Sequence, residues 1–317
     1  MEQELIEKQS LTMSSEYDVA EDVAGLKFAF VNIYMIGKQE EGSPWVLVDA
    51  AIPNSADRII KEAEARFGKD NPPQAIVLTH GHFDHRGSLE DLLKVWNVPV
   101  YAHPLEMPFL TGKSHYPPPD PTAGNGAMSA FSFLFPTSPL NLKDKVKPIP
   151  HNGFIDELPD WRFIHTPGHS PGHVSLFRDK DKVLIAGDAF VTTDQSSAIS
   201  VMTQKLTLHG PPTYFTCDWR AAKKSVRKLA ELKPSAVGTG HGKALHGKEW
   251  RAKIQELSDE FDTRALPWRS RYINNPAHTD ENGIVSMPKP VSYWVAKGLL
   301  YGAAAGLAFF AWNKARK

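Results

Sequence analysis

Histidine and aspartate side chains cluster near residue 80, with a spacing that suits metal binding. The stretch reads Thr-His-Gly-His-Phe-Asp-His and contains His80, His82, Asp84 and His85. In an extended chain, residues i and i+2 point to the same face, so His80 and His82 can bind one metal ion together. The chain is then expected to turn into a helix near Ser88. That turn would direct Asp84 and His85 toward a second centre.

Three further segments combine metal-binding side chains with strand ends or glycine-rich loops. The segment His-Thr-Pro-Gly-His-Ser-Pro-Gly-His contains His165, His169 and His173. Asp188 follows the apolar run Lys-Val-Leu-Ile-Ala, and His241 lies between two glycines after Ala-Val-Gly-Thr. Imidazole and carboxylate ligands suit Zn, Fe, Mn or Ni. A lone histidine is most often a surface or core residue, but the four segments together indicate a metal centre.

Strands and helices predicted from the apolar pattern would position these loops. Each candidate ligand follows a strand end or lies in a glycine-rich loop, where a sheet can hold a loop in place. The order of elements predicts a mixed α/β fold whose sheets are covered by helices. Strands are predicted at residues 27–37, 45–50, 75–79, 98–102, 161–165, 173–177, 182–186 and 236–239, and helices at residues 55–67, 87–96, 219–232 and 248–261.

The composition excludes several classes of protein. The 317 residues include 36 Lys and Arg and 36 Asp and Glu, so the formal net charge is zero, which disfavours nucleic acid as a partner. The single cysteine, Cys217, excludes an intrachain disulfide and cysteine-based zinc fingers. The N-terminal sequence is polar and lacks the apolar core of a secretory signal. A cytoplasmic protein is therefore expected, rather than a secreted one.

Residues 104–147 form a proline- and glycine-rich insertion that contains many aromatic side chains. We interpret it as a lid and as a pocket wall for an apolar group of a small-molecule substrate, because ligand pockets favour aromatic walls. A packing cluster or a homodimer contact is the alternative interpretation. A second wall is expected from residues 208–216. The candidate pocket residues are Phe109, Phe131, Phe133, Phe135 and Tyr214.

The two ends of the chain differ in character from the middle. Residues 1–24 are polar and residues 263–290 are predicted to be a linker. Residues 291–317 are predicted to form an apolar helix, with no charge between Lys297 and Lys314. Residues 291–312 nearly match the length of a membrane-spanning helix, so this segment is interpreted either as a membrane tail or as a helix docked on the domain.

The four metal-binding segments resemble those of the metallo-β-lactamase-fold hydrolase superfamily. The resemblance covers residues 25–262 and implies a four-layer αββα sandwich with two metal ions at one edge of the sheets. Asp188 would bind both metal ions, because a carboxylate offers two oxygens. Asp49 and His173 are candidates for orienting the ligand imidazoles through hydrogen bonds. The first metal ion would be held by His80, His82 and His169, and the second by Asp84, His85 and His241.

The resemblance implies a hydrolase in a generic bacterial branch, near the lactonase-like and glyoxalase II-like members. Zinc is the favoured metal, with iron or manganese as alternatives. A metal-bridging hydroxide would cleave an ester, thioester, lactone or amide, with Asp84 and Asp188 as the catalytic carboxylates. The sequence departs from the lactonases at Val191, where a tyrosine is expected after the bridging aspartate. The alternative is an iron-dependent oxygenase or redox member of the fold, or a metal-binding protein without catalysis.

Overall fold

Two β-sheets form the centre of the structure, a computed structural model that describes residues 16–290. In the first sheet the spatial order follows the chain. Strands β1 to β4 are antiparallel neighbours, and β4 to β7 are parallel. The seven strands are β1 (Glu16–Ala20), β2 (Val23–Phe28), β3 (Val31–Ile36), β4 (Val46–Val48), β5 (Ala75–Val77), β6 (Val100–Ala102) and β7 (Val146–Pro148).

The second sheet has five strands in the order β12-β11-β10-β9-β8. Only β10 and β11 are parallel, and helix α8 lies between them in the chain as a crossover connection. The strands are β8 (Trp161–His165), β9 (Val174–Arg178), β10 (Val183–Ile185), β11 (Ala236–Gly238) and β12 (Leu245–His246).

Apolar side chains from both sheets meet in a shared core. Val48 and Val77 of the first sheet belong to the same buried cluster as Leu176 and Ile185 of the second. The two sheets therefore face each other, and each needs helices on its outer face.

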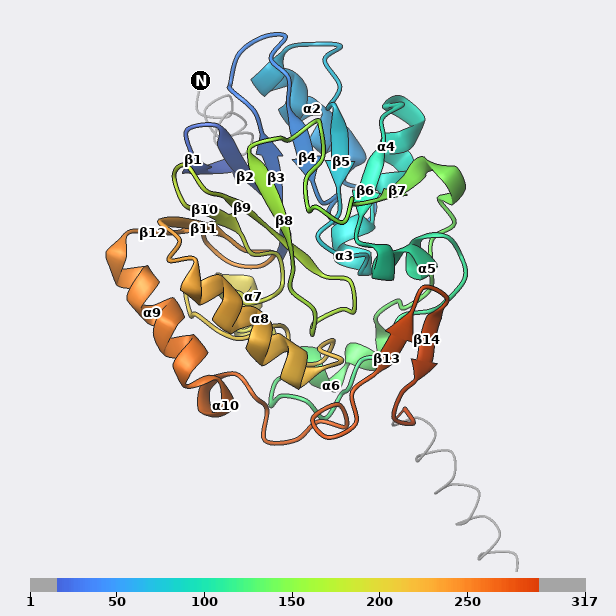
Figure 1. The fold of residues 1–317 in the computed structure, drawn as a ribbon, viewed down its shortest axis with the longest axis vertical. Coiled ribbons are helices and arrows are strands. Elements are labelled where there is room, and N and C mark those ends of the chain that lie inside the picture. The colour runs from blue at the N-terminus through green and yellow to red at the C-terminus, as the bar shows by residue number, and fades with distance from the viewer. Residues whose placement is uncertain (1–15, 291–317) are drawn as a thin grey trace, which may run out of the picture.

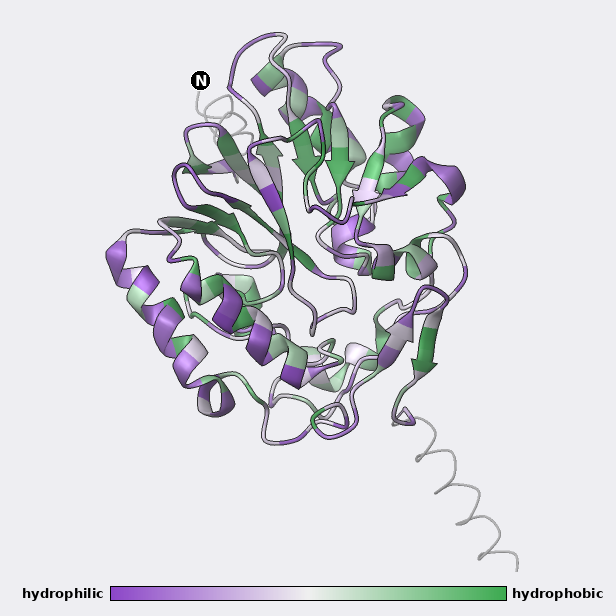
Figure 2. Cartoon of the chain, in the orientation of Figure 1, coloured by the Kyte–Doolittle hydropathy of each residue, from purple (hydrophilic) through white to green (hydrophobic). Residues whose placement is uncertain are grey.

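Two pairs of amphipathic helices cover the outer faces of the sheets (Figure 1). Helices α2 (Ala56–Phe67) and α4 (Leu89–Val95) pack on the first sheet, and α8 (Trp219–Glu231) and α9 (Lys248–Asp259) pack on the second. The predicted mixed α/β architecture is confirmed, with layers in the order helix, sheet, sheet, helix. Figure 2 shows the strands as mostly hydrophobic and α8 and α9 with many hydrophilic residues.

Short elements fill the connections between these layers. Helix α3 carries part of the first histidine cluster, and the insertion contains several short helical turns. The remaining elements are α3 (Phe83–Arg86), η1 (Pro104–Glu106), α5 (Met107–Leu110), α6 (Ala127–Ala130), η2 (Ser132–Leu134), η3 (Lys143–Lys145), α7 (Ala198–Thr203), α10 (Phe261–Arg264), β13 (His278–Asp280) and β14 (Gly283–Ser286).

The structure differs from the sequence prediction in several segments. Strand β7 begins inside the insertion, where no strand was predicted. Residues 27–37, predicted as one strand, belong to the hairpin β2–β3, in which Ala29 adopts a left-handed backbone conformation. Apart from Lys27 and Asn32 the run is apolar, so its composition does not reveal the reversal. Residues 263–290, predicted as a linker, include the hairpin β13–β14 and the buried Tyr272, whose hydroxyl donates to the carbonyl of Pro118 at 2.7 Å.

The predictions for the chain ends fall largely outside the described residues. The apolar helix predicted for residues 291–317, interpreted either as a membrane tail or as a docked helix, lies outside them. Strand β1 begins at Glu16, inside the segment predicted as a polar N-terminal extension. Across residues 16–290, the helices are too short or too polar to cross a membrane.

Candidate metal centre

Four loops at strand ends bring the predicted ligands together at one edge of the two sheets. His80 and His82 follow β5, and Asp84 and His85 lie on α3. Three other loops complete the cluster: His169 lies between β8 and β9, Asp188 follows β10, and His241 follows β11. Because β10 and β11 are parallel neighbours, their carboxyl ends meet at the same edge.

The first group of ligand atoms belongs to His80, His82 and His169, which lie within 4.8 Å of one another and are buried. His82 Nδ1 lies 2.9 Å from His169 Nε2. Thr79 Oγ1 donates its hydrogen to Asp49 Oδ2, so His80 Nδ1 is the donor in its 3.1 Å contact with Thr79 Oγ1. This arrangement leaves the lone pair of His80 Nε2 directed into the cluster.

The second group contains Asp84, His85 and His241. His85 Nδ1 donates to Asp49 Oδ2 at 2.8 Å, and His241 Nδ1 donates to the backbone carbonyl of Phe30 at 2.7 Å. Both imidazoles therefore turn Nε2 toward the cluster, where His241 Nε2 lies 3.5 Å from Asp84 Oδ2.

Asp188 lies between the two groups. Its Oδ2 atom is 3.1 Å from His241 Nε2, 3.3 Å from His169 Nε2 and 3.6 Å from His85 Nε2. One oxygen thus faces imidazoles of both groups. Gly240 packs against the other oxygen so closely that an added Cβ would overlap it.

Burial and charge shift the ionisation of these groups in opposite directions. Burial, and then neighbouring imidazoles, lower the pKa values of His80 and His82 well below the usual range, and burial lowers the pKa of His169 to about 4. Burial also acts to lower the pKa of His85, but nearby carboxylates outweigh it and hold that pKa well above its usual value.

Asp188 is held ionised by its surroundings. Burial acts to raise its pKa, but His241 and His85 outweigh that effect and keep the pKa well below its usual value. Burial raises the pKa of Asp84, which is the most exposed of the seven residues at 7%. The cluster therefore places an ionised carboxylate among imidazoles, an arrangement that favours positive charge at its centre.

The unpaired atoms of the cluster fit a divalent metal ion. Buried polar atoms are almost always hydrogen-bonded, yet His80 Nε2, His85 Nε2 and Asp188 Oδ1 have no hydrogen-bond partner. All three are atoms that donate an electron pair to a cation, and metal binding would satisfy them. Nitrogen and carboxylate oxygen ligands without thiolates suit Zn, Fe or Mn.

The two residues predicted to orient ligands do so in different ways. Asp49 accepts from His85 Nδ1 and from the backbone N–H of Thr79, and so contacts the imidazole of a candidate ligand. His173 forms no hydrogen bond with a candidate ligand imidazole, although its ring lies 5.2 Å from that of His80. Its Nε2 accepts the backbone N–H of Asp188 at 2.8 Å. Its Nδ1 lies 2.9 Å from Thr166 Oγ1, so His173 supports the loop that carries Asp188.

Glu106 connects two of the ligand loops and was not identified from the sequence. Its Oε2 accepts from the backbone N–H of Gly81, at 2.9 Å, and from the hydroxyl of Tyr116. Its Oε1 accepts from Ser170 Oγ at 2.8 Å and from the backbone N–H of Gly172 at 2.7 Å. This fully buried carboxylate ties the His80–His82 loop to the His169–His173 loop. It lies within the irregular insertion, where no periodic pattern marked it.

An aromatic wall lies beside the first group of ligands. The ring of Phe215 stacks on His82 with a centroid distance of 4.5 Å. Phe135 stacks on Phe83 at 5.6 Å and on Phe215 at 6.0 Å, and Tyr214 lies 5.7 Å from Phe135. The predicted pocket residues Phe135 and Tyr214 belong to this wall, and Phe215 lies within residues 208–216, which were expected to form a second wall. Phe83 was not predicted as a pocket residue.

The other predicted pocket residues lie elsewhere. Phe109 is fully buried and stacks on Tyr116 at 4.1 Å, because the insertion has its own packed interior. Phe131 and Phe133 are exposed, with ring centroids 6.5 Å apart. These three phenylalanines therefore do not belong to the wall.

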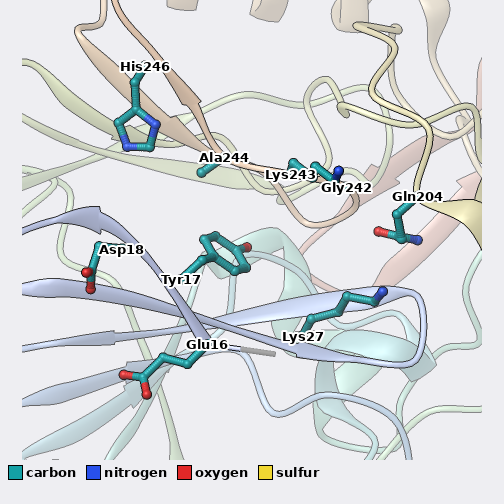
Figure 3. A pocket seen from close by; sticks show the side chains of 9 residues that line it. All are labelled: Glu16, Tyr17, Asp18, Lys27, Gln204, Gly242, Lys243, Ala244 and His246. Carbon is teal, nitrogen blue, oxygen red and sulfur yellow. The ribbon is translucent and has the colours of Figure 1, made fainter. Parts of the chain in front are cut away.

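A separate hollow of about 410 Å³ lies next to the loop that carries His241 (Figure 3). Lys27 from β2 and Tyr17 from β1 line one side, and Lys243 and His246 line the other. None of the seven candidate ligands lines this hollow. It is therefore distinct from the metal centre.

Comparison with known proteins identifies the family. A sequence model of the metallo-β-lactamase superfamily matches residues 26–241, and the chain belongs to that superfamily. It is 44% identical over 254 residues to the probable metallo-hydrolase YflN of Bacillus subtilis, covering 80% of this chain and 96% of YflN. Identity with the probable metallo-hydrolase YybB of the same organism is 29% over 206 residues, covering 65% of this chain and 79% of YybB.

Solved structures support the same fold. A B3 metallo-β-lactamase with an active-site glutamic acid superposes with a TM-score of 0.53 at 17% identity, covering 80% of this chain and 92% of the enzyme. At that identity the likeness concerns the fold alone. The match to the superfamily model and the identity with YflN confirm, at the level of the superfamily, the resemblance inferred from the four motif segments.

Proposed function

We propose that this protein is a binuclear metallo-hydrolase that cleaves an ester, thioester, lactone or amide bond of a small, partly apolar substrate. The observation that carries the proposal is the position of Asp188 Oδ2, which faces imidazoles of both ligand groups at 3.1 to 3.6 Å. The relatives YflN and YybB, named as probable metallo-hydrolases, support the same reaction class.

In this proposal each of the two groups of side chains would hold one divalent cation, and Asp188 would serve both groups. Zinc is favoured, with iron or manganese as alternatives. Such cations supply Lewis acidity, which acidifies water and polarises a carbonyl group. The chain contributes a fixed ligand geometry, since hydrogen bonds from His80, His85 and His241 hold each imidazole in one orientation.

Asp84 is the candidate for moving a proton. Its carboxylate is the most exposed of the seven, and Oδ2 lies 3.5 Å from His241 Nε2. Burial raises its pKa, so Asp84 would accept the proton that the attacking water loses and would later release it to the leaving group.

The aromatic wall determines which part of a substrate lies beside the ligands. Phe83, Phe135 and Phe215 offer ring faces next to His82 and no charged group. They would exclude water and bind an apolar acyl group. An uncharged acyl or aryl portion is therefore expected in the substrate.

Metal analysis and an activity screen test the proposal. His80→Ala and Asp188→Ala are each expected to lower bound metal and hydrolysis together while the circular dichroism spectrum persists. The screen uses zinc- and manganese-loaded protein with esters, thioesters, lactones and β-lactams. An iron-loaded preparation that consumes oxygen and hydrolyses none of these substrates would instead establish the oxygenase or redox alternative.

A further inference from the structure

A face without charged side chains surrounds α6, η2 and α7. Among residues 114–142 the only Asp, Glu, Lys or Arg is Asp120, which is fully buried, and residues 195–204 contain none. The surface of a soluble domain is ordinarily about a quarter to a third charged. This face therefore lacks the groups that normally keep a surface in water.

Large apolar side chains project from the same face. Phe131, Phe133 and Leu134 are 58% to 67% exposed, and Ile199 and Met202 of α7 are 75% and 83% exposed. Single exposed apolar side chains are common on soluble proteins, but a contiguous group of them typically marks an interaction site.

Hydrogen bonds show that the segments adjoin one another. The backbone N–H of Met128 in α6 donates to the carbonyl of Ser196, just before α7, at 3.2 Å. Trp268, itself 74% exposed, donates from Nε1 to Asn125 Oδ1 at 3.1 Å. We call this set of exposed side chains, Phe131, Phe133, Leu134, Ile199, Met202 and Trp268, the apolar face.

The last described residue lies at the edge of the apolar face. Pro290 lines a hollow of about 220 Å³ together with Phe133 and Phe135. The sequence that continues from there, residues 291–312, is rich in apolar and aromatic residues and includes Trp294 and Trp312. In the sequence, an apolar segment therefore follows directly after a residue at the edge of this face.

We propose that the apolar face docks on a lipid surface. A lipid surface accepts apolar and aromatic side chains without requiring complementary charges, and tryptophan and tyrosine favour the headgroup region. Exposed Lys113 and Lys205 flank the uncharged segments in the sequence, and exposed Arg269 follows Trp268. These cationic side chains suit anionic headgroups.

The proposed docking places a lipid surface beside the aromatic wall of the metal centre. Phe135 follows η2 directly and packs on Phe83 and Phe215. The docking itself does not depend on the proposed hydrolysis, so binding and activity can be measured separately.

A fluorescent label on the full-length chain tests the proposal directly. Cys217 is the only cysteine and is buried, so a thiol-reactive, environment-sensitive dye will label Phe133→Cys selectively. Val95→Cys is the matched control, because Val95 is 62% exposed on α4, away from α6 (Figure 1). The probe is a vesicle of phosphatidylcholine and phosphatidylglycerol.

The expected result is a blue shift of the dye on Phe133→Cys when vesicles are added, with no shift on Val95→Cys. Absence of any shift on Phe133→Cys would overturn the proposal. A dye that is already blue-shifted without vesicles, and does not respond to them, would also overturn it. That outcome would show that another part of the chain or a second copy covers the apolar face. Dilution separates the two cases, because only a contact between two copies dissociates on dilution.

A combined Phe131→Ser, Phe133→Ser and Leu134→Ser variant gives an independent measurement. Full burial of one such side chain changes partitioning roughly tenfold, so the three together are expected to lower vesicle binding at least roughly tenfold. Val95→Ser should leave vesicle binding unchanged. Equal binding of the triple variant and the unmodified chain would contradict docking through this face.

Discussion

Replacing Glu106 by glutamine tests whether the link between the two ligand loops positions the ligands. Glutamine keeps the shape of the side chain but exchanges one acceptor oxygen for an NH2 group. Each carboxylate oxygen of Glu106 accepts from one backbone N–H and one hydroxyl. Either orientation of the amide therefore directs its NH2 group at one backbone N–H, of Gly81 or of Gly172.

The magnitude follows from which donors can turn. The hydroxyls of Tyr116 and Ser170 can rotate and accept a hydrogen bond, but a backbone N–H cannot. One buried N–H then loses its partner, which costs about 1–3 kcal/mol, and the remaining bonds lose the strengthening from the charge. We expect a total loss of about 2–4 kcal/mol in the free energy of unfolding, or roughly 5–10 °C in melting temperature for a domain of this size.

Metal affinity distinguishes positioning from stability alone. Gly81 lies between His80 and His82, and Gly172 lies between His169 and His173, so the lost bond releases a loop that carries ligands. We expect roughly 10–100-fold weaker metal binding, measured by chelator competition, and an altered absorption spectrum of the cobalt-loaded protein.

Glu157→Gln is the matched control, because Glu157 accepts from the hydroxyl of Tyr101 at 3.0 Å and contacts no ligand loop. It should leave metal affinity unchanged. A Glu106→Gln variant that binds metal and melts like the unmodified chain would refute the reasoning.

Three further predictions concern charge, packing and metal. Asp22→Asn removes the carboxylate that accepts from Arg178 at 2.5 and 2.7 Å. Burial acts to raise the pKa of Asp22, but Arg178 outweighs burial and holds that pKa below its usual value. The pair therefore stabilises the fold above the unfolded-state pKa, and that stability is lost as pH falls through the lower folded-state pKa. Denaturant unfolding should show a loss of about 1–3 kcal/mol at about pH 7 that shrinks toward about pH 3, and a constant difference would contradict the assignment. Gly240→Ala should lower the metal content, because the added Cβ would overlap Asp188 Oδ1. Gly42→Ala is the control and should not lower it, since a Cβ at residue 42 meets no neighbour. Equal metal content in the two variants would argue against this packing. Removing metal with a chelator should lower the melting temperature by several degrees. A ligand at 100 times its dissociation constant contributes about 2.7 kcal/mol to the free energy of unfolding. An unchanged melting curve would contradict metal binding by the folded chain.

The sequence by itself predicted the ligand types, their order and the alternation of strands and helices. These features depend on local chemistry: an imidazole or carboxylate at a strand end keeps its character in any fold, and apolar spacing reflects which face of an element is buried. For the same reason the β-α-β order around His80 and the helices α2, α8 and α9 were predictable within a few residues.

Only the tertiary structure decided which atoms meet. The distances from Asp188 Oδ2 to three imidazoles depend on how β5, β10 and β11 align across two sheets. The four hydrogen bonds of Glu106, the burial of Phe109 and the exposure of Phe133 arise from an insertion without periodic pattern. Contacts between residues far apart in the chain depend on the packing of whole elements, and no local spacing encodes them.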